Sequence, residues 1–233
     1  MTQPILEVIA CSVSDAIEAE KGGANRLEVV RDLRRGGLTP SWELVREIKS
    51  AVDLPLRVML RESVGYETSG EDEIKKLCLA AEHFAALDVD GFVIGFLKQE
   101  QVDVELTHRV LACAPNVKAT FHHAFEESKD RLEALKEIKG LSQVDRILSS
   151  GGRGALDEKV QRLGEYEEAA SPQITIVAGG GVDSEAILRI GRATRIREFH
   201  IGRAARSLFQ VEGQVQARLV SGLAQVLKKL QEQ

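Results

Sequence analysis

The chain of 233 residues has little of what marks several protein classes. It contains three cysteines, one tryptophan and five prolines, and its 36 acidic residues outnumber its 31 basic ones, which gives a net charge of −5. The charges are mixed along the chain, with no basic block that could neutralise a phosphate backbone. We therefore expect no nucleic-acid partner.

Long apolar runs are also missing. No stretch approaches the roughly 18 apolar residues that cross a bilayer, and the first residues, MTQPILEVIA, lack the basic start and long apolar run of a secretory signal. We expect a cytoplasmic protein without a membrane partner. Cys11, Cys78 and Cys113 are odd in number and have no C-x-x-C spacing, which argues against a disulfide framework and a preformed zinc site.

An alternation of strand and helix signals runs through the chain instead. Hydrophobic residues make up 43% of it, enough for a full core. Short apolar runs rich in β-branched residues recur at near-regular intervals, and each is typical of a strand buried on both faces. These runs are Ile5–Cys11, Arg26–Val30, Leu56–Leu60, Gly91–Phe96, Val117–Phe121, Val144–Leu148, Gln173–Ala178 and Phe199–Ile201.

Segments with helical periodicity and recognisable ends lie between these runs. Thr39 is expected to cap a helix that begins with Pro40, and Asp183 to open one that stops at Gly191. A final amphipathic segment, Gly213–Leu230, supplies the last helix. Eight strand–helix units in this length predict an α/β fold, a single-domain (β/α)8 barrel of TIM type over residues 1–233, rather than a doubly wound sheet.

Strand parity places charged side chains inside this barrel. One face of each strand packs on the helices and must be apolar, so a polar residue in a strand points inward or to the C-terminal rim. Buried charges must pair with one another or meet a ligand, because an unpaired one costs several kcal/mol. Both a satisfied polar plug and an active site fit this pattern. The inward set is Glu7, Glu28, Arg61, Thr120, His122 and His200.

Two adjacent histidines stand out in KATFHHAFEES. His122 points inward, and a histidine flanked by carboxylates would gain basicity and act as a general acid or base near neutral pH. His123 begins the rim loop, so we expect it, oriented by Glu126, to tune specificity rather than perform the central step. Arg61 would stabilise developing negative charge. The expected catalytic set is His122, Glu7, Glu28, Arg61 and His200.

Glycine-rich turns follow the last three strands, at SSGGRG, GGGVD and GRAARS. Glycines let backbone N–H groups converge on an anion, and the loops after the last two strands are the usual phosphate seat of this fold. Tight turns are the alternative use of the same glycines. The expected pocket for a phosphate or carboxylate consists of Ser149, Ser150, Gly151, Gly180, Gly181, Arg203 and Arg206.

Eight segments carry a resemblance to a known family, in chain order LEVIACS, GGANRLEVV, GGLTPS, VMLR, TFHHAFEE, RILSSGG, AGGGV and EFH. They resemble the CutC family, whose name comes from copper homeostasis. The resemblance spans essentially the whole chain. It implies a cytosolic TIM-type barrel, a homo-oligomer with a dimer as the expected state, and a role in copper homeostasis with Cu(I) as the bound ion. The family's shared polar positions fall on Glu7, Glu28, Arg61, His122, Ser150 and His200.

The chain also departs from the family pattern. Cysteines proposed as copper ligands in the family fall on Ile9 and Val30 here, which leaves Cys11 as the candidate metal ligand. One thiol is a poor Cu(I) site unless a donor such as Met59 joins it. The rim loop after the third strand is acidic where the family has RPRGGDF, and His123 replaces an arginine, so a titratable imidazole stands in place of a fixed cation.

Three functions fit these observations. The first is copper handling, as the family implies. The second is an enzyme with isomerase- or lyase-like acid–base chemistry on a small phosphorylated or carboxylated metabolite. The third is a barrel kept for partner binding, in which Trp42 would be an interface anchor, although a core or rim position suits it better.

Overall fold

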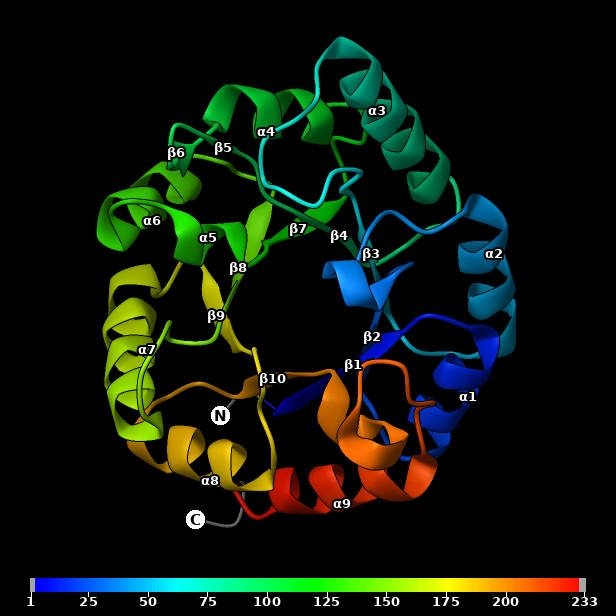
Figure 1. Ribbon diagram of the computed structural model, residues 1–233, viewed down its shortest axis with the longest axis vertical. Coiled ribbons are helices and arrows are strands. Elements are labelled where there is room, and N and C mark those ends of the chain that lie inside the picture. The colour runs from blue at the N-terminus through cyan, green and yellow to red at the C-terminus, as the bar shows by residue number, and fades with distance from the viewer. Residues whose placement is uncertain (1–2, 231–233) are drawn as a thin grey trace.

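A closed barrel of eight parallel strands forms the centre of the protein, and helices surround it (Figure 1). The computed structural model describes residues 3–230. Each strand of the barrel pairs with the next one along the chain, and β10 pairs with β1, which confirms the predicted (β/α)8 fold. The strands are β1 (Ile5–Ala10), β2 (Arg26–Val29), β3 (Leu56–Met59), β4 (Gly91–Ile94), β7 (Lys118–Phe121), β8 (Val144–Ser149), β9 (Thr175–Ala178) and β10 (Glu198–Ile201).

The outer layer consists of helices that follow the strands in sequence (Figure 1). The α-helices are α1 (Val13–Lys21), α2 (Trp42–Ala51), α3 (Glu71–Ala85), α4 (Val104–Leu111), α5 (Ala124–Glu127), α6 (Arg131–Lys139), α7 (Leu156–Ala170), α8 (Ser184–Ala193) and α9 (Ala217–Lys228). Short 3₁₀ turns lie at the rim: η1 (Leu33–Arg35), η2 (Arg203–Ala205) and η3 (Ser207–Phe209). Within residues 3–230, no helix has both the length and the apolar character needed to span a bilayer.

The main core lies between the barrel and the helices. The strand residues that parity directs outward, such as Leu6, Leu27, Phe121 and Phe199, are fully buried there. The same alternation leaves the polar residues of these strands inside the barrel, because successive side chains of a strand point to opposite faces. The outward apolar side chains therefore pack the barrel against the helices, and the inward polar side chains lie in its interior.

The start of α2 differs from the prediction. The helix begins at Trp42, and Ser41 is its N-cap, with Oγ accepting from the backbone N–H of Leu44 at 3.2 Å. Thr39 serves another purpose, because its hydroxyl donates to the backbone oxygen of Arg61 at 3.0 Å and accepts from that residue's N–H at 2.9 Å. Thr39 thus ties this loop to the end of β3 and holds the rim of the barrel together.

Two further helix ends lie elsewhere than expected. Gly191 does not stop α8, which continues to Ala193. Its role is close packing, since a Cβ at this position would lie 2.3 Å from Cδ1 of Leu230. The last helix begins at Ala217 rather than Gly213, because the preceding residues return to the rim, where Gln216 donates its backbone N–H to Ala205 at 2.9 Å.

Two surface features complete the fold. A hairpin that the sequence did not signal, β5 (Leu97–Lys98) with β6 (Gln101–Val102), follows β4, and its turn residues have φ of 52° and 60° without the usual Asn or Gly. Trp42 is 36% exposed on the outside of the barrel, with the Arg46 guanidinium 4.9 Å from its ring centroid.

Candidate functional site

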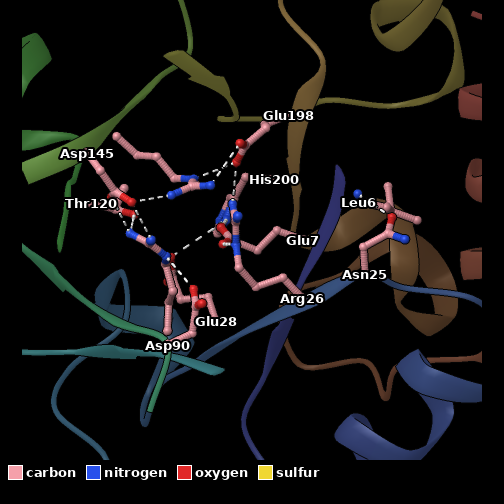
Figure 2. Close-up of polar contacts among 12 residues, drawn as sticks. Leu6, Glu7, Asn25, Arg26, Glu28, Asp90, Thr120, Asp145, Glu198 and His200 are labelled. Atoms are coloured by element: carbon pink, nitrogen blue, oxygen red, sulfur yellow. Dashed lines mark hydrogen bonds and ion pairs between the residues drawn. The ribbon is translucent and has the colours of Figure 1, made fainter. Parts of the chain in front are cut away.

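The N-terminal half of the barrel interior contains a satisfied ion network (Figure 2). Arg57, 1% exposed, donates to both oxygens of Asp145 at 2.9 and 3.0 Å and to the Thr120 hydroxyl at 2.8 Å. Its Nε donates to Asp90 at 3.1 Å. This part of the interior is the polar plug that strand parity allowed, because every charge in it has an opposite charge beside it.

Two more arginines extend the network across the barrel. Glu198 accepts from Arg26 at 2.7 Å and from Arg146 at 2.8 and 3.1 Å, and Arg26 also donates to Glu7. The sequence reasoning missed Arg26 and Arg146. Arg26 lies two residues before Glu28 in the same strand, so parity alone was a sufficient signal.

A histidine lies between two carboxylates where the network meets the C-terminal half of the barrel interior. Nδ1 of His200 is 2.7 Å from Glu7 Oε1 and 3.6 Å from Glu28 Oε2, and all three side chains are buried. Burial disfavours the imidazolium, but Glu28 and Glu7 outweigh it and raise the pKa of His200. His200 is therefore the histidine that takes the position between carboxylates, which the sequence had suggested for His122.

The two carboxylates respond to this place in opposite ways. Burial opposes ionisation of Glu7, but Arg26 and His200 outweigh it and hold its pKa well below the usual range. Burial raises the pKa of Glu28, against the lowering effect of His200, and Glu28 Oε2 is buried without a hydrogen-bond partner among the described residues. The geometry thus separates an ionised carboxylate from one that retains its proton more readily.

The surroundings of His122 favour the neutral form of its imidazole. The backbone N–H of Ala124 donates to its Nδ1 at 3.2 Å, and its ring lies 5.3 Å from that of Tyr66. Burial, together with Arg61 and His123, places the pKa of His122 well below its ordinary value, so the expectation that its basicity would be raised is wrong. Its Nε2 is buried with no partner within residues 3–230. Gly95 makes room for the ring, since a Cβ there would lie 2.7 Å from Nδ1.

Above these side chains a cavity of about 540 Å³ opens at the C-terminal ends of the strands. Glu28, His122 and His200 line it, together with apolar side chains such as Ile9 and Met59. Barrel enzymes place their active sites at this end. The structure therefore brings four of the five expected catalytic residues, Glu28, Arg61, His122 and His200, to one pocket, with Glu7 directly behind His200.

Arg61 lies at the rim of the pocket, and its guanidinium is already hydrogen-bonded within the protein. Its guanidinium donates to four backbone oxygens, those of Ser63, Gly36, Arg35 and Val64, at 2.6 to 3.3 Å. It also lies 5.1 Å from the ring centroid of Tyr66. Because most of its N–H donors are used in this way, the main contribution of Arg61 is to hold the rim loops around the pocket.

The turn after β8 binds an anion that belongs to the chain itself. Oε1 of Glu126 accepts from the hydroxyl of Ser149 at 2.9 Å and from the backbone N–H groups of Ser150 and Gly152 at 2.7 and 2.9 Å. Burial opposes ionisation, but His123 and these donors lower the pKa of Glu126 to about 2. Ser149 and Ser150, expected to seat a ligand anion, thus bind the Glu126 carboxylate instead, and Gly151 donates its backbone N–H to the Ser149 hydroxyl at 3.1 Å.

The turns after β9 and β10 remain open to the pocket. Gly180, Gly181 and Arg203 line it, and no acceptor among residues 3–230 takes the backbone N–H groups of the two glycines. Arg203 is exposed and has no ion-pair partner within residues 3–230. Arg206 is not part of this group. It is buried and donates to Asp15 at 3.1 Å and to the backbone oxygen of Ile9 at 2.9 Å, so it fastens the loop after β10.

One cluster in the described chain has the spacing of a metal site. Ligand atoms of Glu7, Glu28 and His200 lie within 4.8 Å of one another. Its oxygen and nitrogen donors suit a hard or borderline cation rather than Cu(I), which prefers sulfur. Glu7 and His200 already neutralise each other at 2.7 Å, and the raised pKa of His200 favours a proton on its ring, so the pairing works against a metal ion.

Cys11 is poorly placed for copper. Burial raises the pKa of its thiol to about 11, and its sulfur accepts from Arg206 at 3.6 Å. It lines a neighbouring cavity between α1 and the loop after β10, and the described lining of the main pocket contains one thioether, Met59, and no thiol. Ile9, Val30 and Met59 form a small apolar cluster beside it. The donor set around the pocket therefore fits Cu(I) weakly.

Comparison with known proteins identifies the family. A sequence profile of the CutC family matches residues 4–205. The chain belongs to the CutC family. A CutC family protein of Bacteroides fragilis is 34% identical over 204 residues, which cover 86% of this chain and 80% of that protein. The human copper homeostasis protein cutC homolog is 31% identical over 197 residues, with 84% of this chain and 72% of that protein covered.

A solved CutC structure shares the barrel. The CutC protein of Streptococcus agalactiae matches with a TM-score of 0.79 and 24% sequence identity, and the match covers 85% of this chain and 98% of that one. At this level of identity the likeness establishes the fold. The function must therefore be argued from the residues in the pocket.

Proposed function

We propose that the pocket is the active site of an enzyme with isomerase- or lyase-like acid–base chemistry on a small phosphorylated or carboxylated metabolite. The observation that carries this proposal is that two buried polar atoms of residues lining the same pocket, Glu28 Oε2 and His122 Nε2, have no hydrogen-bond partner among residues 3–230. A buried polar atom without a hydrogen bond costs about 1–3 kcal/mol. A ligand that bonds to both atoms accounts for their position.

The electrostatics support a division of roles. Glu28, whose pKa is raised, is suited to donate or accept a proton, while Glu7, whose pKa is lowered, stays ionised and supports His200. His122 offers an N–H group in a buried site, and such a donor stabilises an oxygen on which negative charge develops. The residues at the pocket floor thus include a proton-transfer group and a fixed electrophile.

The anionic end of the ligand would lie at the other side of the pocket. The N–H groups of Gly180 and Gly181 have no acceptor within residues 3–230, and their φ values of 71° and 99° are a backbone conformation that suits glycine. Free N–H groups on successive residues suit an anion. Arg203 supplies a cation beside it, since a Cβ on Gly181 would lie 3.7 Å from its guanidinium nitrogen. A phosphate or carboxylate suits these donors.

A thermal-shift screen of phosphorylated and carboxylated metabolites tests the proposal. We expect at least one compound to raise the melting temperature of the wild-type protein and of a His83→Gln control, in which an exposed histidine on α3 is changed. Arg203→Gln and His122→Gln should weaken binding of the same compound. No shift with any compound of either class, or equal shifts in all four proteins, would overturn the proposal.

Copper binding is a second candidate, favoured by the presence of Met59 and His122 in the lining of one pocket. A thioether and an imidazole can hold Cu(I) without a thiolate, although weakly. Titration of Cu(I) against a competing chelator tests it, with Met59→Leu and Cys11→Ser as variants. Loss of binding in Met59→Leu would support a site in the pocket, and unchanged affinity in Cys11→Ser would place Cys11 outside it. Binding unaffected by Met59→Leu would exclude this site.

A further inference from the structure

The two adjacent histidines are held by hydrogen bonds of opposite direction. Nδ1 of His122 accepts from the backbone N–H of Ala124, which can only donate, so the proton of the neutral ring lies on Nε2. Nδ1 of His123 lies 3.1 Å from Glu126 Oε2. Because Glu126 is ionised, with a pKa of about 2, it can only accept, so Nδ1 of His123 carries a proton. Neutral His123 therefore has its lone pair on Nε2.

Glu126 is positioned to enforce this arrangement. Ser149, Ser150 and Gly152 hold its carboxylate with four hydrogen bonds to Oε1 at 2.7 to 2.9 Å, and the Ser150 hydroxyl is also 3.0 Å from Oε2. The carboxylate is therefore fixed before it meets the ring. A buried carboxylate that holds Nδ1–H of a histidine orients the imidazole and leaves Nε2 free as a base.

Both rings face the same pocket. His122 and His123 line it, and the side chain of His123 is 34% exposed, so a ligand can reach it. His123 is also close enough to act on the pKa of both His122 and Glu28. A Cβ on Gly180 would lie 3.4 Å from Cε1 of His123, which places the ring beside the open glycine turn. A donor and an acceptor imidazole thus line the same pocket.

We propose that His123 is the general base of the reaction, oriented by Glu126 as a positioning residue, and that His122 Nε2–H stabilises the oxygen that becomes negative. This assignment rests on the proposed function and specifies its substrate class, a small carbonyl compound that carries a phosphate or carboxylate and a C–H bond next to the carbonyl. The sequence had suggested a lesser, specificity role for His123.

The proton transfer balances without a further reactant. Nε2 of His123 takes the proton from the carbon next to the carbonyl, and the C–H electron pair becomes the C=C bond of an enolate. The carbonyl π electrons move to oxygen, which accepts a hydrogen bond from Nε2–H of His122. Return of the proton from His123 to the carbon restores the carbonyl, and in D2O this return introduces deuterium.

The tautomers can be measured without a ligand. Long-range proton–nitrogen NMR correlations on labelled protein, recorded above the pH range in which the histidines titrate, should show the proton of His122 on Nε2 and that of His123 on Nδ1. His122→Gln and His123→Gln assign the signals. In Glu126→Gln the new amide can donate to Nδ1, so His123 should change to the Nε2–H form. An Nε2–H form of His123 in the wild-type protein would overturn the assignment.

The reaction is tested by deuterium exchange. Dihydroxyacetone phosphate and pyruvate are incubated with the protein in D2O, together with any carbonyl compound from the thermal-shift screen. We expect the wild-type protein to catalyse C–H exchange, and the exchange rate to fall about 100-fold or more in His123→Gln. The fall should be smaller in Glu126→Gln. Both variants should still bind the ligand, and His83→Gln should exchange at the wild-type rate. Binding with exchange that His123→Gln leaves unaltered would overturn this assignment alone. Binding of non-carbonyl compounds alone would also overturn this assignment and leave the proposed function standing, whereas no binding by any compound of the thermal-shift screen would overturn both.

Discussion

Glu7 and His200 face each other from the neighbouring strands β1 and β10, with Oε1 and Nδ1 2.7 Å apart and both side chains buried. Arg26 donates to the other oxygen of Glu7. This carboxylate therefore joins two regions of the interior, the ion network at the N-terminal half of the barrel and the pocket at the C-terminal end. The charge balance of one region depends on the other through this residue.

Replacement of this carboxylate should be costly. Glu7→Gln leaves the Arg26 and His200 cations without their shared anion, and loss of one member of a buried ion pair costs about 3–5 kcal/mol. The pKa of His200 should fall, because Glu7 contributes to its elevation. Urea unfolding measures the first effect and NMR titration of His200 the second. A loss no larger than that of Glu43→Gln, an exposed control on α2, would contradict the shared-anion interpretation.

Arg57 and Arg109 allow a comparison of buried and exposed ion pairs. Each guanidinium donates two hydrogen bonds to one carboxylate, Arg57 to Asp145 inside the barrel and Arg109 to Glu71 on the surface. Arg57→Met should lower the free energy of unfolding by about 3 kcal/mol or more, and Arg109→Met by about 1 kcal/mol or less. Equal losses in urea unfolding would show that the interior network adds nothing beyond its surface counterpart.

The folded chain should lose stability in acid through Glu126. Its pKa is lowered from 4.5 to about 2 on folding, so its contribution is present above 4.5 and is lost as the pH falls towards 2. At about 1.4 kcal/mol per unit, the contribution at neutral pH is about 3 kcal/mol. Urea unfolding at a series of pH values should show wild type above Glu126→Gln at neutral pH, and the two converging at the acid end. Parallel curves would refute the linkage.

Two glycines give opposite predictions for the same substitution. Gly95→Ala places a methyl group 2.7 Å from the buried His122 ring, so it should destabilise the protein by about 1–3 kcal/mol and disturb the His122–Ala124 hydrogen bond. Gly222→Ala, in α9 where the new Cβ would meet no atom within 4 Å beyond its chain neighbours and the backbone of its own helix, should stabilise it by up to about 1 kcal/mol. Urea unfolding checks both signs. A neutral Gly95→Ala would mean that the His122 ring moves freely.

The fold was predictable because it depends on local, repeated patterns. Eight apolar runs with helical segments between them predict the barrel, and each strand of the barrel lies within a residue or two of its predicted bounds. Parity also placed Glu7, Glu28 and His200 correctly in the interior, since strand side chains alternate regardless of what they contact. Thr39 and Gly191 were misread as helix ends, because their roles depend on Arg61 and Leu230, which are distant in sequence.

By itself, the sequence determined the family, the closed barrel and the set of polar side chains that must lie within it. Only the tertiary structure decided how that set divides. It placed His200, and not His122, between carboxylates, filled the turn after β8 with Glu126, and paired Arg206 with Asp15. The physical reason is that protonation and hydrogen-bond direction depend on which groups meet within about 3 Å, and these groups come from segments far apart in the chain. The adjacent histidines show this most directly, because Ala124 and Glu126 orient identical side chains in opposite ways.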